Sequence, residues 1–164
     1  MGLYDDVYAA LHAAGVRFVV VGGTAVVHHG HVRLTVDLDL VVDLAVDNAR
    51  EAVRALTGVG LRPLLPVDPV DFADPAIRTD WVDNRNLMVF TFFDPASVTR
   101  RVDVFAIYPV PFEALHDAAV EATMGGVPVK LASRQDLLVM KRAAGRPQDL
   151  LDIEALEALP DTRA

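Results

Sequence analysis

The stretch Val19–Val42, VVVGGTAVVHHGHVRLTVDLDLVV, decides the fold expected for this chain of 164 residues. An apolar run leads into Gly22–Thr24, a short segment follows, and a second apolar run carries Asp37 and Asp39. Because successive side chains of a strand point to opposite faces, both aspartates would share one face and Leu38 would be buried on the other. We expect the rest of the chain to support this unit.

The composition limits the classes of protein to be considered. Hydrophobic residues make up 52% of the chain, but no apolar run approaches the roughly 18–20 residues that span a bilayer. The N-terminus lacks the basic region of a signal peptide, and the absence of cysteine excludes disulfides and thiolate sites, so a cytoplasmic protein without membrane contact is expected. A net charge of −8 argues against strong binding of duplex nucleic acid, although a local basic strip or metal-bridged nucleotide remains compatible with it.

The hydrophobic periodicity predicts one α/β (α+β) domain over residues 1–164, with the order αβαβα, then strands, then two helices. Helices are expected over residues 3–14, 24–29, 47–56, 112–118, 133–144 and 148–159, with Thr24, Asp47 and Ser133 as N-caps. Strands are expected over residues 16–21, 35–42, 61–65, 87–93, 101–107, 120–124 and 127–131. Four prolines make 61–77 an expected surface loop or lid. The prediction is a mixed sheet (core about 16–131) with helices mainly on one face and a C-terminal helical pair (about 133–159).

The aspartate pair Asp37 and Asp39 is the first candidate for chemistry. Two carboxylates on one face of a buried strand repel each other and lose hydration, which is costly unless a cation compensates. Hard divalent ions such as Mg²⁺ prefer oxygen ligands of this kind. The alternative is an exposed edge strand with a solvated acidic face, and the apolar residues flanking the pair argue against it.

The Gly22-Gly23-Thr24 turn is the second candidate. Two glycines allow the backbone to approach a ligand closely, and N–H groups at the start of the next helix attract phosphate oxygens. Residues 24–36, thirteen in all, separate Gly23 from Asp37, which is enough for a short helix and a return to the adjacent strand. The sequence therefore predicts a phosphate-binding turn beside a metal-binding pair, with a simple chain turn as the alternative.

Asp103 is the third candidate because it is a single acid in the apolar β-run 101–107. On a strand next to the aspartate pair, it would help to hold a metal and act as general base on an acceptor hydroxyl. The alternative is a structural ion pair with Arg100 or Arg101 at the start of its strand.

These motifs together resemble a known superfamily. The pattern hGG[ST], thirteen residues, DhDh and a lone later aspartate is similar to the nucleotidyltransferase superfamily of the DNA polymerase beta type. The ending, Pro128–Lys141 followed by Gly145–Asp152, resembles the AbiEii-like branch, which includes toxin components of toxin–antitoxin systems. The resemblance covers about Val16–Leu156.

The resemblance implies roles for individual residues. Asp37, Asp39 and Asp103 would bind two Mg²⁺ ions and an NTP, and Gly22, Gly23 and Thr24 would hold the triphosphate. Arg33 and Thr35 match an R-x-T lead-in, Lys130 matches a lysine that contacts the nucleotide, and Lys141 and Asp152 match a K…RxxDxxD tail. Larger members carry a substantial C-terminal domain, whereas this sequence ends soon after the tail motif, so an acceptor site built on that domain is expected to be missing or to come from a partner. For the tail, a well-stabilised helix start is an equally acceptable alternative.

Three functions follow from these expectations. The first is Mg²⁺-dependent transfer of an NMP from an NTP to a tRNA end or protein hydroxyl, with an antitoxin-like partner. The second is nucleotidyl transfer to a small antibiotic such as a lincosamide or aminoglycoside. The third is a non-catalytic, nucleotide-binding regulator of the same fold.

Overall fold

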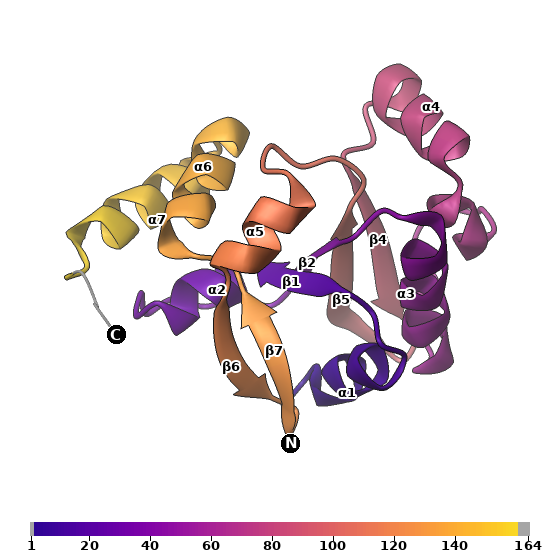
Figure 1. The fold of residues 1–164 in the computed structure, drawn as a ribbon, viewed down its shortest axis with the longest axis horizontal. Coiled ribbons are helices and arrows are strands. Elements are labelled where there is room, and N and C mark those ends of the chain that lie inside the picture. Colours follow the sequence, from indigo (N-terminus) through magenta and orange to yellow (C-terminus); the bar gives the residue numbers. More distant parts are fainter. Residues whose placement is uncertain (1, 161–164) are drawn as a thin grey trace.

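The computed structural model describes residues 2–160 and shows a mixed sheet with the strand order β3-β4-β5-β2-β1-β7-β6 (Figure 1). The strands are β1 (Phe18–Val21), β2 (Leu38–Val42), β3 (Arg62–Pro63), β4 (Val89–Asp94), β5 (Ser97–Phe105), β6 (Val120–Met124) and β7 (Val127–Leu131). The helices are α1 (Asp5–Ala13), α2 (Gly22–His28), α3 (Val46–Gly58), the 3₁₀ helix η1 (Pro69–Ala73), α4 (Pro75–Arg85), α5 (Phe112–Ala118), α6 (Arg134–Ala144) and α7 (Pro147–Ala158).

The pairing of the strands places β2 at the centre of the sheet. It runs antiparallel to β1 and parallel to β5, and β1 in turn runs parallel to β7. The β4–β5 and β6–β7 pairs are antiparallel hairpins. The predicted mixed α/β sheet and the C-terminal helical pair, α6 packed on α7, are therefore confirmed.

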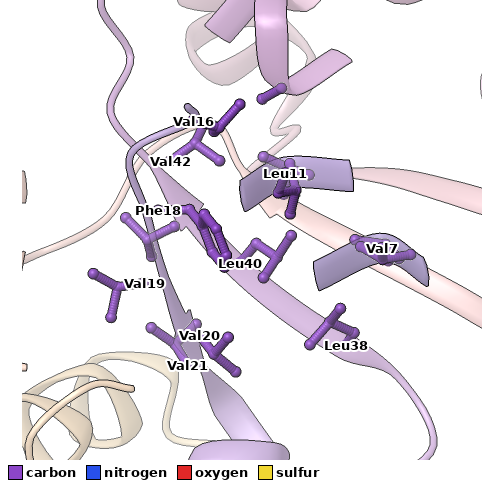
Figure 2. Packing of buried hydrophobic residues seen from close by; sticks show 14 of the residues in the cluster. Val7, Leu11, Val16, Phe18, Val19, Val20, Val21, Leu38, Leu40 and Val42 are labelled. Carbon is purple, nitrogen blue, oxygen red and sulfur yellow. The ribbon is translucent and has the colours of Figure 1, made fainter. Parts of the chain in front are cut away.

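The core explains why the first half of the chain folds around β1 and β2. Every residue of β1 is buried, and Leu38 and Leu40 of β2 are fully buried. Figure 2 shows these leucines together with Val7 and Leu11 of α1, which belong to the same apolar cluster. Burying one such side chain contributes about 1.5–3 kcal/mol to the stability of the fold. Because the leucines of β2 are held in this cluster, the opposite, polar face of the strand is held in a fixed position.

Some expected boundaries were wrong. Helix α2 begins at Gly22 with Val21 as its N-cap, so Thr24 lies within the first turn. Helix α3 begins at Val46 after Ala45, so Asp47 is also in the first turn and not the cap. Strand β2 begins at Leu38, because β1 ends at Val21 opposite Asp39, and on the β5 side the Tyr4 hydroxyl donates to Val36 O and Arg101 O where pairing would continue.

The predicted loop over 61–77 was partly wrong, because it contains η1 and the start of α4. The Asp68 side chain accepts a hydrogen bond from Val70 N, and the Asp74 side chain accepts from Ala76 N and Ile77 N. In each case the aspartate is an N-cap followed by proline at the first helical position. The expected short edge strand is present as β3. Among residues 2–160, no helix combines the length and apolar character that crossing a bilayer would require.

Candidate active site

Asp39 and Asp103 lie side by side on the parallel strands β2 and β5. The same level of the sheet includes Val21, paired with Asp39, and Thr91, paired with Asp103. Residues directly opposite each other on paired strands share a face, so these four side chains form one row across β1, β2, β5 and β4. The row brings the two predicted carboxylates together at the point where β1 enters α2.

Thr91 orients the Asp103 carboxylate. Its Oγ1 donates a hydrogen bond of 2.6 Å to Asp103 Oδ1. Within residues 2–160, no group donates a hydrogen bond to Oδ2. One carboxylate oxygen is thus fixed by the protein while the other is available to a ligand. The alternative of an ion pair with Arg100 is wrong, since Arg100 bonds Asp94 and Asp6.

The Gly22-Gly23 turn is shaped by the side chains that it touches. A Cβ on Gly22 would lie 2.0 Å from Asp39 Oδ2, and Gly22 has a left-handed φ of +63°. A Cβ on Gly23 would lie 2.4 Å from Thr35 Oγ1 and 2.8 Å from Arg33 Nη2. Glycine is required at both positions because the backbone of the turn contacts these side chains directly.

The electrostatics of the pair fit a cation between the carboxylates. Burial raises the pKa of Asp39 to about 7, and the neighbouring Asp103 carboxylate adds to the rise. Burial also raises the pKa of Asp103, although the Thr91 hydrogen bond opposes this. Two half-buried carboxylates with such shifts suit a divalent ion with oxygen ligands. The residues present therefore fit Mg²⁺ at Asp39 and Asp103.

Asp37 takes a different position from the other two aspartates. It is exposed and precedes β2, although its charge contributes to raising the pKa of Asp39 and of Asp103. In the part of the chain that the structure describes, no group of three His, Cys, Asp or Glu residues is arranged to hold a metal. The arrangement is thus a pair of carboxylates with a third nearby.

The C-terminal tail forms a buried ion cluster around Lys141. Its Nζ lies 3.1 Å from Asp149 Oδ1 and 2.8 Å from Asp152 Oδ2. The Lys141 side chain is 7% exposed, and the two aspartate side chains are 1% and 0% exposed. Charges this deeply buried are tolerated only when they are paired, so the tail is a fixed structural unit.

Two arginines complete this cluster, one at each aspartate. Arg33 Nη2 donates to Asp152 Oδ2 at 3.0 Å, and its Nε lies 2.9 Å from Oδ1 without hydrogen-bond alignment. Arg146 Nε donates to Asp149 Oδ2 at 2.7 Å. Burial alone would raise the pKa of Asp149 and Asp152, but hydrogen bonds from the basic groups outweigh it and hold both values below the ordinary range.

Lys130 lies on β7 and Thr24 in the first turn of α2, outside the carboxylate row. Lys130 Nζ donates to His116 O at the end of α5, at 3.2 Å. Thr24 is half-buried in the first turn of α2. Neither residue lines the cavity that contains Asp39 and Asp103.

That cavity has a volume of about 580 Å³ and lies between the sheet and α6. Asp39, Asp103 and Gly22 stand at one part of its wall, together with Lys141, Asp149 and Arg146. Most of the remaining wall is apolar, and includes Met88, Val89, Phe105, Ile107, Leu137 and Met140. A cavity of this size and character, with a few polar groups, is typical of a small-molecule site.

Three residues of this site were not selected from the sequence. Thr91 lies in an ordinary β-run, and nothing in the sequence around it indicates a functional residue. Only the β4–β5 register places it opposite Asp103. Arg146 and Asp149 belong to the tail motif already quoted, and their spacing of three, with proline between them, is a recognisable helix start. The helix-start pattern at Arg146 and Asp149 could have been recognised in the sequence, whereas the role of Thr91 could not.

Comparisons with known proteins identify the family and the fold of the chain. A family model described as "Nucleotidyl transferase AbiEii toxin, Type IV TA system" matches residues 6–162. No curated protein sequence matches the chain.

Solved structures with a similar fold are nucleotidyltransferases or are described as resembling them. The lincomycin-bound lincosamide antibiotic adenylyltransferase LnuA superposes with a TM-score of 0.60 at 14% identity, covering 93% of both chains. The antibiotic-resistance factor ANT(2'')-Ia gives 0.59 at 16% identity, over 94% of this chain and 80% of the other. An antigenic nucleotidyltransferase-like protein from Paracoccidioides brasiliensis gives 0.52 at 16% identity, over 98% and 78%. At these identities the likeness shows the fold.

Proposed function

The chain belongs to the AbiEii nucleotidyl transferase family, and we propose that it transfers an NMP group from an NTP to an acceptor hydroxyl. The observation that carries this proposal is the side-by-side pairing of Asp39 and Asp103 against the Gly22 turn. Asp39, Asp103 and the nearby Asp37 would hold Mg²⁺, with two ions expected. Bound Mg²⁺ supplies neutralisation of the phosphate charge and polarisation of the phosphoryl oxygens.

The Gly22–Thr24 turn is assigned to the β- and γ-phosphates. The two glycines bring the backbone of the turn directly against the side chains of Asp39, Thr35 and Arg33, so a phosphate bound at the turn would lie next to these groups. Arg33 adds a cation against Gly23, and Asp152 holds the guanidinium in place. In this assignment Lys141 and Asp152 act by positioning Arg33, because their own polar atoms are buried in the ion cluster. Lys130 remains a proposed nucleotide contact.

Asp103 is assigned as the proton acceptor. The acceptor oxygen forms a bond to the α-phosphorus while the bond from that phosphorus to the bridging oxygen breaks. The electron pair of the broken bond leaves with pyrophosphate, and the hydroxyl proton passes to Asp103 Oδ2, the oxygen that Thr91 does not engage. The raised pKa of Asp103 suits a carboxylate that must take up a proton.

The acceptor is open between two classes. As a toxin of the type IV toxin–antitoxin kind, the protein would modify a tRNA end or a protein hydroxyl in the cytoplasm and be opposed by an antitoxin-like partner. One observation favours a small-molecule acceptor instead, namely the largely apolar cavity of about 580 Å³ beside Asp103. A non-catalytic regulator would bind the nucleotide and would not transfer an NMP group.

Label transfer tests the proposal. The protein is incubated with Mg²⁺, each NTP labelled at the α-phosphate, and pools of tRNA, protein or aminoglycosides and lincosamides. Transfer to one pool is expected, and Asp39→Asn should abolish it while remaining folded by circular dichroism. Asp47→Asn, whose side chain is 96% exposed on α3, is the matched control and should keep full activity. Absence of transfer together with absence of thermal stabilisation by any Mg–NTP would contradict the proposal.

A further inference from the structure

Arg146 is held at the wall of the cavity by a two-point contact with Asp149. Its Nε donates to Asp149 Oδ2 at 2.7 Å and its Nη2 to Oδ1 at 3.3 Å. Two parallel bonds to one carboxylate fix the plane of a guanidinium as well as its position. Asp149 is fixed in turn, since it is 1% exposed and also accepts a hydrogen bond from Lys141.

The other edge of this guanidinium is free. The Arg146 side chain is 74% exposed although its partner is buried, and within residues 2–160 its Nη1 has no hydrogen-bond acceptor. An ordinary surface ion pair exposes both partners and holds neither firmly. Here a buried carboxylate orients an arginine whose remaining N–H donors face outward, which is the arrangement of a preorganised anion-binding group.

Arg146 shares its cavity with the carboxylate row. Asp39, Asp103 and Arg146 all line the same space. The charge of Arg146 reaches both carboxylates, where it acts to lower their pKa values against the effect of burial. Arg33, by contrast, lies against Gly23 at the turn assigned to the β- and γ-phosphates. The two buried aspartates of α7 thus each hold one arginine, Arg33 near the turn and Arg146 at the cavity.

We propose that Arg146 binds a non-bridging oxygen of the phosphoryl group being transferred, an inference that rests on the proposed nucleotidyl transfer. A phosphoryl group held at Asp39 and Asp103 would lie in the cavity that Arg146 also lines. Arginine donates hydrogen bonds to such oxygens without taking part in bond making, and it stays protonated throughout. The charge that it stabilises is greatest in the transition state, so its main effect is on kcat.

Arg146 also has a structural role, because it is the N-cap of α7. Its backbone N–H donates to Asp149 Oδ2 at 3.1 Å as part of a capping box. Serine is a better N-cap than arginine, so Arg146→Ser keeps the helix start while removing the guanidinium. The two roles can therefore be separated in one variant.

The experiment compares wild type, Arg146→Ser, Arg146→Lys and the exposed control Arg142→Ser. The assay measures transfer from α-labelled NTP to the pool that the wild type modifies. Arg146→Ser should lower kcat about 100-fold, the usual cost of losing one preorganised donor. Its KM for NTP should change less than about threefold, because an interaction made mainly in the transition state contributes little to binding of the substrate in the ground state. Arg146→Lys should restore only part of the rate, since the lysine ammonium keeps the positive charge but cannot make the planar two-point contacts of a guanidinium.

Two further readouts exclude a structural explanation. Guanidinium ion added at millimolar concentration should partly restore kcat in Arg146→Ser and leave Arg142→Ser unchanged. The thermal midpoint of Arg146→Ser without nucleotide should fall, because Asp149 loses two hydrogen bonds, but it should stay above the assay temperature so that rescue of kcat is measured on folded protein. Wild-type kcat in Arg146→Ser, or a raised KM with unchanged kcat, would overturn the inference while leaving the proposed function intact. A wild-type protein that neither transfers label nor binds Mg–NTP would overturn both.

Discussion

Gly22 leaves the space that the Asp39 carboxylate fills, since a Cβ at position 22 would stand 2.0 Å from Asp39 Oδ2. The contact joins the predicted phosphate turn to the predicted metal pair, although helix α2 and the loop after it separate the two motifs in the sequence. It explains why the first position of the turn must be glycine, independently of its φ.

Gly22→Ala should therefore abolish transfer and also destabilise the fold. The left-handed φ of +63° and the clash with Asp39 together should cost roughly 1–3 kcal/mol in the free energy of unfolding. Displacement of the carboxylate should lower kcat/KM at least about 100-fold. Urea unfolding and initial rates measure the two effects.

Gly60→Ala is the control for this prediction. Gly60 has a φ of +90°, but a Cβ there would meet nothing within 4 Å. It should share the backbone cost and keep normal activity. Equal activity in the two variants would show that the Gly22–Asp39 contact has no functional importance.

Thr91→Val should lower kcat about 10- to 100-fold, which is typical when the partner that orients a reactive carboxylate is lost. Valine has the shape of threonine without the hydroxyl that donates to Asp103 Oδ1. Because that hydrogen bond lowers the pKa of Asp103, its loss should raise this pKa and shift the acid limb of the rate profile to higher pH.

Thr91→Ser retains the hydroxyl and should keep both the rate and the pH profile near those of the wild type. Steady-state rates across pH, with Mg²⁺ held saturating, distinguish the variants. Identical profiles for the valine and serine variants would rule out an orienting role for Thr91.

Lys141→Met should be among the most destabilising single changes in the chain. It removes the cation between Asp149 and Asp152, leaving two buried carboxylates with fewer partners. Breaking a buried pair of this kind costs about 3–5 kcal/mol. Urea denaturation at pH 7 measures the loss.

Arg142→Gln provides the comparison, because it removes a neighbouring ion pair with Glu157 in which both side chains are about half exposed. Such surface pairs contribute about 0–1 kcal/mol. Similar losses in the two variants would mean that burial gives the Lys141 cluster no special importance.

Local sequence patterns predicted much of this molecule, and long-range contacts supplied the rest. The apolar run at β1 and the alternation around Asp39 determine two buried strands and the face on which the carboxylate lies. A lone acid in an apolar run was sufficient to select Asp103. The pairs Asp68-Pro69 and Asp74-Pro75 are helix-start signals that were outweighed by the density of prolines.

The ion cluster could not be predicted in the same way. Arg33 and Asp152 are 119 residues apart, and nothing in either segment indicates that they meet. The pairing of Thr91 with Asp103 depends on the register of β4 against β5, which a turn of two residues and an irregularity at Phe93/Asp94 determine. Sequence patterns indicated which residues are chemically competent, whereas the packing of distant elements decided which of them touch.

Asp39→Asn should be more stable than the wild type at pH 8 without Mg²⁺. Burial and Asp103 raise the pKa of Asp39 from 3.8 to about 7, so between these values the folded protein holds a proton that the unfolded chain lacks. The stability of the wild type therefore falls as pH rises from about 4 to 7 and stays lower above pH 7. Asparagine does not ionise, so the variant should have a flatter profile and gain about 0.5–2 kcal/mol at pH 8.

Added Mg²⁺ should reverse this order, because an ion that binds only the folded state stabilises it by RT ln(1 + [Mg²⁺]/Kd). The wild type should be stabilised and Asp39→Asn should not, whereas the control Asp47→Asn should follow the wild type in both conditions. Urea unfolding at pH 5 and pH 8, with EDTA or MgCl₂, gives the four values needed for each protein. Equal stabilisation of wild type and Asp39→Asn by Mg²⁺ would place the ion elsewhere, because a carboxylate that is costly in the free protein should recover that cost only when it binds the cation.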